Sequence, residues 1–389
     1  MDDIEGRFYE APDNLQLMTP ATKTPLTYEQ AGVRYEAIDP LKVAAQRAAA
    51  ATGSHLAAHG FAEVHASRGE SAYVFDVGPF YIASIIECLG SKALVADEMQ
   101  RLTGRSSYYA GIAQDTLAMA INDLITVGAT PLAVQAYWAA GGSDWFDDAG
   151  RSAALVEGWK AACDRCGVAW GGGETPALAG IVEAGRIDLA ASCTGLVNPK
   201  ERLTLGDKLG PGDAIVLLAS SGIHANGLSL ARKLIERLPG GYLTEIEPGL
   251  TYGDALLAPT LLYSPVTEAL WRAGVPVHYA ANITGHGWRK LLRHPKVLTY
   301  RIHTVPPVPA VLAFIAERAG HDAAEAYGTL NMGAGFALFV AAGDAERSVE
   351  VARRAGIEAW VAGTVEAGEK QLLIEPLEVR FGADELRLR

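Results

Sequence analysis

The sequence has few of the features that mark membrane, secreted or nucleic-acid-binding proteins. No stretch of its 389 residues approaches the ~20 uninterrupted apolar residues that a membrane-spanning helix needs. Three of its first five residues are acidic and no apolar core follows them, so they do not resemble a secretory signal. Lys and Arg total 33 against 45 Asp and Glu, without a basic run that would form a nucleic-acid-binding surface. We therefore expect a cytoplasmic protein that binds neither membrane nor nucleic acid.

Cysteine is also scarce, with four residues in the whole chain. That number is too small for a disulfide scaffold at this length and fits a reducing compartment. Cys163 and Cys166 form one C-x-x-C within a helical pattern, and no second Cys or His pair lies nearby in the sequence to complete a zinc site. We interpret them as two ordinary thiols near a helix end; metal or redox chemistry is the alternative.

The composition is typical of a globular enzyme with two domains. Hydrophobic residues make up 49% of the chain and charged residues 20%. A charged stretch with glycines and prolines at 198–212 indicates a domain boundary near residue 206. We predict a leader over residues 1–26, an N-terminal domain over 27–205 and a C-terminal domain over 206–389.

Apolar periodicity predicts strands that alternate with helices. In the N-terminal domain the predicted strands are 72–77, 80–87, 131–138 and 189–197, and the predicted helices are 41–51, 112–127 and 152–166. In the C-terminal domain the all-apolar run 214–219 is typical of a strand buried on both faces, and a helix is predicted after it at 227–238. The alternation continues to residue 365 and indicates a two-domain α/β or α+β fold.

Segment 87–92 ends an apolar strand with an acid and continues with a glycine, a hydroxyl and a lysine. Glu87 at the strand end is a candidate Mg²⁺ ligand, and Lys92 would neutralise a phosphate, with Gly90 and Ser91 in the turn between them. The segment lacks the glycine spacing of a Walker A loop. The alternative is a strand followed by an ordinary charged turn.

The predicted helix 112–127 carries an oxygen-rich face. Asp115 and Asn122 are seven residues apart and share one side of the helix, and Asp123 lies one position round from Asn122. Hard cations prefer such oxygen ligands, and Mg²⁺ with a nucleotide commonly uses one or two carboxylates. The alternative is a solvated helix face.

Further along the chain, three glycines and an acid follow a short apolar run at 168–170, which places Gly173 and Glu174 in a constrained loop, as a metal or nucleotide contact or as an exposed turn.

The strongest local signal is the loop that follows the buried strand 214–219 and opens a helix. Ligands of open α/β sheets lie at the carboxyl ends of strands, and free N–H groups at a helix start bind phosphate. His224 would orient the substrate or move a proton. The alternative is that the polar residues only cap the helix. The candidate substrate-binding residues of this loop are Ser220, Ser221, Gly222, His224, Asn226 and Gly227.

A second loop repeats this logic after another predicted strand. It contains Thr284 and Gly285, and with the first loop it would hold an extended phosphorylated ligand. A third glycine-rich turn occupies 327–335, and segment 256–260 is interpreted as a helix junction.

Taken together, these segments resemble the aminoimidazole ribonucleotide synthetase family, whose members are also called phosphoribosylformylglycinamidine cyclo-ligases. The resemblance covers nearly the whole chain after the leader, in the family's order and spacing. The segments that carry it are 28–33, 111–131, 172–175, 220–230, 256–260, 284–287 and 331–335.

The resemblance implies a fold and a reaction. Two subunits would join their N-terminal sheets into a barrel, giving a homodimer, and the C-terminal half would form an α/β layer. ATP and Mg²⁺ would bind between the halves. ATP would phosphorylate the amide oxygen of formylglycinamidine ribonucleotide, a small phosphorylated metabolite, and a neighbouring nitrogen would displace phosphate to close the imidazole ring of aminoimidazole ribonucleotide, in purine biosynthesis. In this interpretation Glu87, Asp115, Asp123 and Glu174 hold the metal, Gly90, Ser91, Lys92, Asn122 and Gly173 contact the nucleotide, and His224, Lys92 and Asp115 act in catalysis.

The nucleotide-side half departs from the family pattern. Cys88 stands where the family's Asp-Gly-Val-Gly-Thr-Lys motif has a glycine, and an acid is missing after Thr175. Gln46 stands where the family's first helix normally offers a lysine to the nucleotide, and a different segment, 54–69, precedes the first strands. These changes keep a second hypothesis open: a paralogue that activates another phosphorylated amide or acid, or that only binds a nucleotide.

Overall fold

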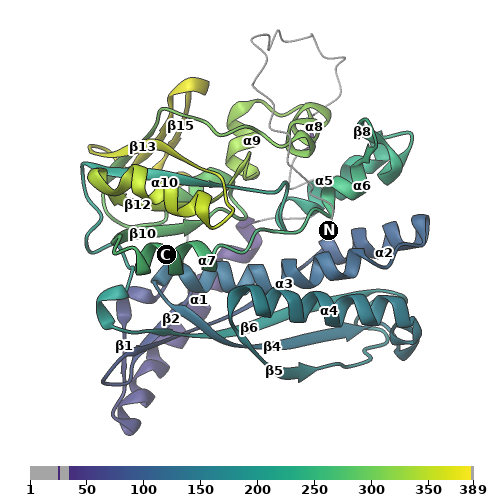
Figure 1. Cartoon of the computed structure of the whole chain (residues 1–389), viewed down its shortest axis with the longest axis horizontal. Coiled ribbons are helices and arrows are strands. Elements are labelled where there is room, and N and C mark those ends of the chain that lie inside the picture. The colour runs from purple at the N-terminus through teal and green to yellow at the C-terminus, as the bar shows by residue number, and fades with distance from the viewer. Residues whose placement is uncertain (1–24, 27–34, 387–389) are drawn as a thin grey trace.

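The computed structural model describes residues 25, 26 and 35–386, and in this part of the chain it has two large β-sheets, one built before residue 198 and one after residue 212 (Figure 1). Most of the predicted leader lies outside the described residues. Its last residue, Leu26, is buried: its N–H donates to the carbonyl of Ala319 (3.0 Å), and its own carbonyl lies 2.8 Å from Nε2 of His321.

The N-terminal sheet has six strands in the order β1-β2-β3-β6-β4-β5. Its pairs are antiparallel except β4 with β5, which are parallel. The strands are β1 (Ala62–Glu63), β2 (Tyr73–Asp76), β3 (Tyr81–Cys88), β4 (Thr130–Ala140), β5 (Ala169–Glu174) and β6 (Ile187–Val197). This sheet is preceded by α1 (Tyr35–Thr52), η1 (Gly53–His59) and, before β2, η2 (His65–Ser67).

One face of this sheet is covered by helices and the other is open. The helices of this half are α2 (Lys92–Thr103), α3 (Tyr108–Leu124), which continues as η3 (Ile125–Val127), and α4 (Ala149–Cys166), with η4 (Ser143–Asp147) before it. Figure 1 shows α3 and α4 lying over the sheet, with α3 between it and the C-terminal half. Alternate residues of β6 are buried under these helices. On the other face Ile86 is 72% exposed and Leu132 is 46% exposed.

The C-terminal sheet has seven strands in the order β10-β12-β7-β13-β11-β14-β15, antiparallel except for β11 with β14. Its strands are β7 (Asp213–Ala219), β10 (Val277–Asn282), β11 (Leu298–Ile302), β12 (Ala334–Ala341), β13 (Ala359–Ala367), β14 (Gln371–Ile374) and β15 (Val379–Gly382). The first six residues of β7 are buried, which confirms the prediction of a strand covered on both faces.

Helices and a small hairpin surround this sheet. The helices are α5 (Leu228–Leu234), α6 (Tyr252–Leu256), α7 (Ser264–Arg272), α8 (Ala310–Ala319), α9 (Ala323–Thr329) and α10 (Ala345–Arg354). Strands β8 (Glu245–Glu247) and β9 (Leu250–Thr251) pair with each other, and short 3₁₀ helices include η5 (Lys200–Arg202), η6 (Ile235–Arg237), η7 (Gly241–Leu243), η8 (Gly287–Leu292), η9 (Ala342–Asp344), η10 (Glu375–Leu377) and η11 (Ala383–Glu385).

Three glycine-rich loops meet at one edge of the C-terminal sheet. Strands β7 and β10 are both antiparallel to β12, which lies between them, so β7 and β10 end at the same edge where β12 begins. The N–H of Ser220 donates to the carbonyl of Gly333 (2.9 Å), and the N–H of Ile283 donates to the carbonyl of Gly335 (2.9 Å). The antiparallel order therefore brings together loops whose residues, such as Ser220 and Gly333, are 113 positions apart in the chain.

Two local predictions were wrong. The segment predicted as a constrained glycine loop is largely β5 itself. Position 173 in this strand is a glycine because a Cβ there would approach the carbonyl oxygen of Ala136 to 2.0 Å. The glycines therefore allow close packing of two strands. The helix predicted at 227–238 is shorter: α5 ends at Leu234, and η6 follows.

Candidate active site

Helix α3 positions the residues that join the two halves of the molecule. Its polar face lies against segment 258–263, which connects α6 to α7. Nε2 of Gln114 donates to the carbonyl of Thr260 (2.8 Å). Asn122 donates from Nδ2 to the carbonyl of Leu261 (2.8 Å) and accepts the N–H of Tyr263 at Oδ1 (3.0 Å). The side-chain amide of Asn122, predicted to contact the nucleotide, is thus occupied by the protein backbone.

The same helix face carries a buried ion pair. Nζ of Lys92 lies 2.9 Å from each carboxylate oxygen of Asp115, and both side chains are fully buried. Lys92 also donates to the carbonyls of His224 (2.9 Å) and Ala258 (2.8 Å). Asp115 accepts from the N–H (2.7 Å) and the hydroxyl of Thr260. Burial lowers the pKa of Lys92 and raises that of Asp115, while their mutual attraction opposes both shifts.

This pair places two predicted site residues in the interior, where neither side chain is exposed. Lys92 was expected beside phosphates and Asp115 at the metal, both as catalytic residues. All three hydrogens of the Lys92 ammonium are used, two of them by carbonyls of the C-terminal half. The buried lysine with three acceptors and the carboxylate, which contacts the Lys92 ammonium and the N–H and hydroxyl of Thr260, form an interdomain clasp in which neither side chain is exposed.

The loop after β7 is organised by Asn331 from the third glycine-rich turn. Its Oδ1 accepts from the hydroxyl of Ser220 (2.7 Å), and its Nδ2 donates to the carbonyl of Gly222 (2.8 Å). The hydroxyl of Ser221 donates to the carbonyl of Pro259 (2.6 Å). Ser221 and Asn226 remain partly exposed at the edge where the loops meet, and Gly227, with φ 95°, starts α5.

His224 is built into this loop as a neutral side chain. It is buried, adopts a left-handed backbone conformation (φ 60°), and its Nε2 accepts the N–H of Ser221 (3.1 Å). Burial, with a contribution from Lys92, lowers the pKa of His224 to about 3. An imidazole that is neutral and whose acceptor nitrogen is occupied fixes the shape of the loop; this geometry does not support the predicted role in proton transfer.

The four predicted metal ligands are not assembled within one chain. Glu174 is exposed at the end of edge strand β5. Its neighbour Gly173 pairs with Ala136, Ala136 with Ala191, and Ala191 with Glu87. Three strand spacings of ~4.8 Å therefore separate Gly173 from Glu87, roughly 14 Å in total. Asp115 belongs to the ion pair. Among the described residues, no group of three or more His, Cys, Asp or Glu side chains is arranged to hold a metal.

Two of the four acids do lie together. Glu87, on the helix-covered face of β3, and Asp123, near the end of α3, repel each other, and Nδ2 of Asn282 at the end of β10 donates to Asp123 (2.7 Å). Burial, followed by the charge of Asp123, raises the pKa of Glu87 to about 7. Gly90, with φ 73°, and Ser91 follow β3 directly and lead into α2.

These two carboxylates fit a divalent cation. A buried pair of like charges is unfavourable, as the raised pKa of Glu87 indicates, and a cation between them removes the repulsion. Mg²⁺ is commonly bound by one or two carboxylates and keeps its remaining positions for water and phosphate. Glu87 and Asp123 would hold it.

Cations surround this acidic pair. Lys290 on η8 interacts electrostatically with Glu87 and Asp123, and burial, followed by Arg293, lowers the pKa of Lys290 to about 8. Lys42 on α1 is within electrostatic reach of Lys290. Sequence reasoning missed Lys290, Arg293 and Lys42. The spacing of Lys290 and Arg293, three residues apart directly after the Thr284–Gly287 loop, was a usable signal.

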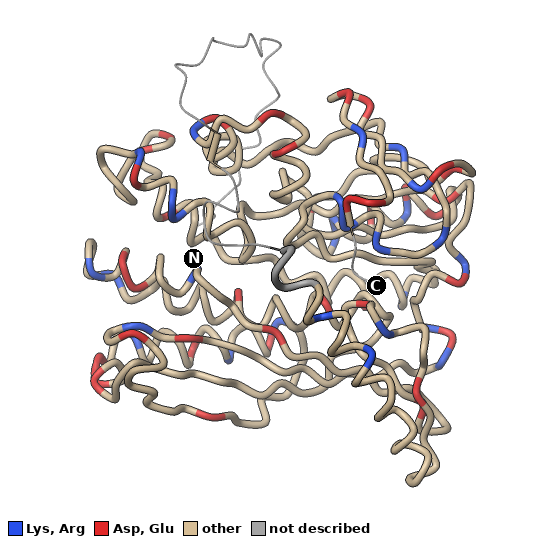
Figure 2. Tube along the Cα trace, turned by 180° about the vertical axis from the view of Figure 1, so that it is seen from behind, with Lys and Arg blue, Asp and Glu red and all other residues tan. Residues whose placement is uncertain are grey.

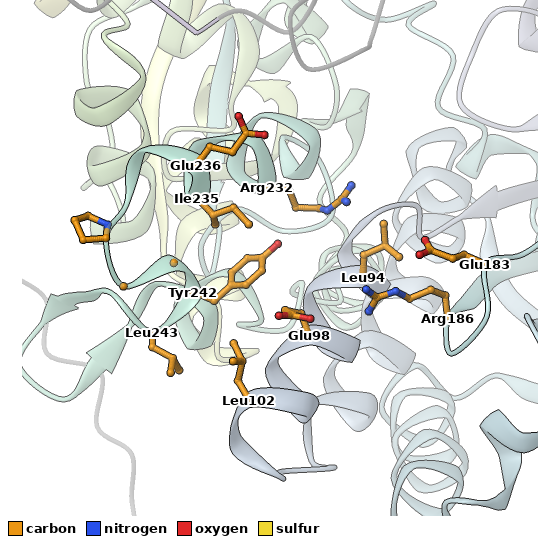
Figure 3. Close-up of a pocket in the computed structure, with 13 residues that line it drawn as sticks. Leu94, Glu98, Leu102, Glu183, Arg186, Arg232, Ile235, Glu236, Tyr242 and Leu243 are labelled. Atoms are coloured by element: carbon orange, nitrogen blue, oxygen red, sulfur yellow. The ribbon is translucent and has the colours of Figure 1, made fainter.

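A cleft with a volume of about 590 Å³ lies between the two halves, away from the acidic pair. It is lined by α2 and by the region from α5 to η7, and no residue predicted for the site lines it. In Figure 3 the side chains of Glu98 and Arg186 point toward one another, with Tyr242 and Arg232 facing them from the C-terminal half.

Family models match both halves of the chain. The N-terminal domain of AIR synthase related protein matches residues 69–197, and the C-terminal domain of AIR synthase related protein matches residues 210–374. The chain belongs to the AIR synthase related family. The two matched regions coincide with the N-terminal and C-terminal sheets.

Curated relatives extend this assignment. A phosphoribosylformylglycinamidine cyclo-ligase of Anaeromyxobacter dehalogenans is 38% identical over 260 residues, covering 65% of this chain and 73% of that protein. A protein of the same name from Methanothermobacter thermautotrophicus is 34% identical over 300 residues, covering 75% and 82%.

Solved structures share the fold of this AIR synthase related chain. The HypE–HypF complex aligns with a TM-score of 0.57 at 17% identity, covering 80% of this chain and 92% of that one. PurL of T. maritima, complexed with FGAR, aligns with a TM-score of 0.53 at 16% identity, covering 81% and 47%. These likenesses establish a mixed α/β fold in two domains. In the described part of the chain, every helix is too short or too polar to cross a bilayer.

Proposed function

We propose that this chain is an ATP-dependent phosphoribosylformylglycinamidine cyclo-ligase, which closes the imidazole ring of formylglycinamidine ribonucleotide to aminoimidazole ribonucleotide. One observation carries the proposal: relatives of that name are 33–38% identical to this chain, and the longest of these alignments cover about three quarters of it. The activity would belong to purine biosynthesis, in the cytoplasm. We also place the domain boundary within the connector 198–212, near residue 206.

The acidic pair supports the nucleotide side of this reaction. Glu87 and Asp123 would hold the Mg²⁺ that accompanies ATP, and the hydrogen bond from Asn282 would orient Asp123. The ion, when bound, neutralises charge on the transferring phosphoryl group. Phosphoryl transfer needs positioning and charge neutralisation more than covalent catalysis by the protein, so this reaction does not require a nucleophilic side chain.

The converging loops support the substrate side. Ser221, Asn226, Thr284 and Gly285 are partly exposed where β7 and β10 end. Hydroxyl, amide and backbone N–H groups at such a position bind a phosphorylated substrate without many positive side chains. The neutral His224 would hold the first loop in shape. Ser220, Gly222 and Gly227 would contribute through the loop backbone.

The open face of the N-terminal sheet supports a homodimer. Ile86 and Leu132 expose large apolar side chains there, and a sheet face of this kind is stable in water when a second layer covers it. We infer that a second copy covers this face and that the two sheets form the barrel expected for the family.

The decisive experiment mixes purified protein with ATP, Mg²⁺ and formylglycinamidine ribonucleotide and follows ADP and aminoimidazole ribonucleotide together. Equimolar formation of both products is the expected result. ADP formation or ATP binding without ring closure would contradict the cyclo-ligase assignment.

That contrary result would favour the second candidate, a paralogue of the same fold with another phosphorylated substrate or with nucleotide binding alone. A specific observation keeps it in view: Cys88 is exposed where the family's nucleotide-side motif has a glycine, and Gln46 stands at the position of the family's lysine.

A further inference from the structure

We propose that the cleft between α2 and the region from α5 to η7 binds the phosphate group of a phosphorylated metabolite, with Arg186 and Arg232 as its partners. No residue proposed for the cyclo-ligase reaction lines this cleft, so the two proposals rest on different residues. The phosphate is either that of the ribonucleotide substrate or that of a second metabolite, and these two sources differ in their effect on KM.

The cleft has one wall from each half of the molecule. Its N-terminal wall consists of α2 with Glu183 and Arg186, and its C-terminal wall consists of Arg232 on α5 and the region from η6 to η7. In Figure 3 the guanidinium groups of Arg186 and Arg232 both point into the space between these walls, and the hydroxyl of Tyr242 faces the same space. Clefts of about 300–1,000 Å³ typically hold small organic ligands, and the volume here is about 590 Å³.

The backbone of each arginine is fixed. The N–H of Arg186 donates to the carbonyl of Glu183 (3.1 Å), which closes a turn directly before β6, and the carbonyl of Arg186 accepts the N–H of Gly141 (3.0 Å). Arg232 lies on α5, a helix with four buried apolar residues. The two side chains therefore extend from ordered elements of opposite halves, and a ligand that binds both would bridge the halves.

The glutamates of the cleft do not neutralise these arginines. Both carboxylate oxygens of Glu98 accept from Arg101, at 3.1 Å from Nε and 2.6 Å from Nη2. Glu236 pairs with Lys233 (2.6 Å), and Glu183 is exposed to solvent. Two of the three carboxylates in the lining thus have ion-pair partners of their own.

Arg186 and Arg232 are available to a ligand. Among residues 35–386, no carboxylate lies within ion-pair distance of either guanidinium group. Burial raises the pKa of Tyr242, and the charges of Arg232 and Arg186 oppose that rise, which agrees with their place in Figure 3 beside its hydroxyl. The planar fork of an arginine donates to two oxygens of a phosphate at once. Two such groups and a hydroxyl in one cleft therefore fit a phosphate.

The charge of the whole chain makes a local site of this kind necessary for binding an anion. The formal net charge is −12, and Figure 2 shows acidic and basic residues interspersed along the described trace. A phosphate would therefore be held by individual guanidinium groups and not by a broad basic surface.

Exposed apolar side chains narrow the class of ligand. Leu102 on α2 is 38% exposed and Leu243 on η7 is 45% exposed, and both line the cleft. Contact with carbon atoms of a ligand would remove this apolar surface from water. A phosphate that is attached to an organic body, such as the ribose of a ribonucleotide, therefore fits the cleft better than free phosphate does.

The walls of the cleft continue into the candidate active site. Helix α2 begins at Lys92, shortly after Glu87, and α5 begins at Leu228, directly after the loop that contains His224. Lys92 donates to the carbonyl of His224 (2.9 Å), so the starts of the two helices are joined. A metabolite bound between the later parts of α2 and α5 would thus act on the same two elements that position the nucleotide and substrate loops.

The test titrates the protein with ribose 5-phosphate in a calorimeter, and with ribose as the phosphate-free control. Wild type should bind ribose 5-phosphate and not ribose. Arg186→Met and Arg232→Met should each weaken this binding about 10-fold or more, because each removes charge-assisted hydrogen bonds to the phosphate. Arg272→Met is the matched control, because Arg272 is an exposed arginine at the end of α7 and does not line the cleft.

Urea unfolding separates a binding role from a structural one. Neither arginine has a carboxylate partner, so both methionine variants should have the same free energy of unfolding as the Arg272→Met control. Arg186→Lys offers a second check. It keeps the positive charge without the planar fork, so it should retain part of the affinity for ribose 5-phosphate.

Turnover of the two methionine variants separates the two sources of the phosphate. If the phosphate is the substrate's own, the KM for formylglycinamidine ribonucleotide should rise about 10-fold or more together with the loss of ribose 5-phosphate binding. If it belongs to a second metabolite, ribose 5-phosphate binding should be lost at a wild-type KM.

Failure of wild type to bind ribose 5-phosphate, or wild-type affinity in both methionine variants, would overturn this site and leave the proposed reaction standing. Binding of ribose 5-phosphate through these arginines in a protein that does not close the imidazole ring would overturn the reaction and leave the site standing.

Discussion

The ion pair between Lys92 and Asp115 offers the sharpest test of the way the two halves are joined. The Asp115→Asn variant keeps the size of the side chain and an oxygen that can accept from the N–H and hydroxyl of Thr260. It removes the negative charge that pairs with a fully buried lysine. Removing one partner of such a pair costs about 3–5 kcal/mol, because the remaining charge stays in a medium that solvates it poorly.

The measurement is urea unfolding at neutral pH, with the free energy of unfolding compared between variants. A double variant, Lys92→Met with Asp115→Leu, removes both charges. It should be less destabilised than Asp115→Asn, although the carbonyls of His224 and Ala258 each lose a donor, because no buried charge remains. Additive effects in the double variant, or a loss below about 1 kcal/mol in Asp115→Asn, would refute the reasoning.

Asp123→Asn is the matched control for this test. It retains an acceptor for Nδ2 of Asn282 and leaves the ion pair intact, so the free energy of unfolding should change by less than in Asp115→Asn. The order of the two variants should be reversed in their response to Mg²⁺. Asp123→Asn should raise the Mg²⁺ concentration needed for half-maximal turnover, whereas Asp115→Asn should leave that concentration unchanged in whatever fraction remains folded.

Three further predictions concern pH, the histidine and the dimer. The pKa of Glu87 is raised to about 7 from 4.5, so between these pH values the folded protein binds more protons than the unfolded chain. The stability contributed by this group therefore falls as pH rises from about 4.5 to 7, with a slope of at most about 1.4 kcal/mol per pH unit. Urea titrations of the metal-free proteins should show this slope in wild type and not in Glu87→Gln. Because the pKa of His224 is lowered to about 3, its imidazole resonances should not titrate between pH 5 and 9 in NMR spectra, and a midpoint near 6.5 would contradict its neutral, buried state. Ile86→Asp should shift the mass measured by light scattering from dimer to monomer, while the same change at Leu41, an exposed apolar residue on α1, should not; an unchanged dimer would move the interface off the open sheet face.

The sequence predicted β2, β3, β4, β6 and β7 because their apolar runs are long and are bounded by glycine, proline or charge, whereas the short strands β1, β14 and β15 were not predicted. The run at 214–219 is an example, and it is a strand covered on both faces. Strand β5 was missed because Gly171, Gly172 and Gly173 lack the side chains that mark a strand. The reason for Gly173 is the backbone of the neighbouring strand, which no local pattern reveals.

The candidate site was predicted in part, and the errors have one physical origin. The oxygen-rich face of α3 was interpreted as a cation site or as a solvated surface. Most of this face instead binds segment 258–263, about 140 residues later in the sequence, through its amides and its buried carboxylate. Polar residues on a helix look the same in sequence whether they face water, metal or another backbone. Only the three-dimensional arrangement distinguishes these environments.

The clasp between α3 and segment 258–263 also bears on how this protein could be recombined with its relatives. Within this clasp, apart from the contact of Asp115 with the hydroxyl of Thr260, the side chains of Lys92, Gln114 and Asn122 bind carbonyl and N–H groups of the C-terminal half, which every amino acid except proline presents in full. A chimera spliced in the connector 198–212 would therefore keep these backbone contacts even when the side chains of segment 258–263 come from a distant parent, whereas side-chain pairs between the halves, such as Asp123 with Asn282 and Ser71 with Arg293, would need matching residues. For the same reason, natural sequences could change in segment 258–263 without losing the backbone hydrogen bonds that this segment makes with α3.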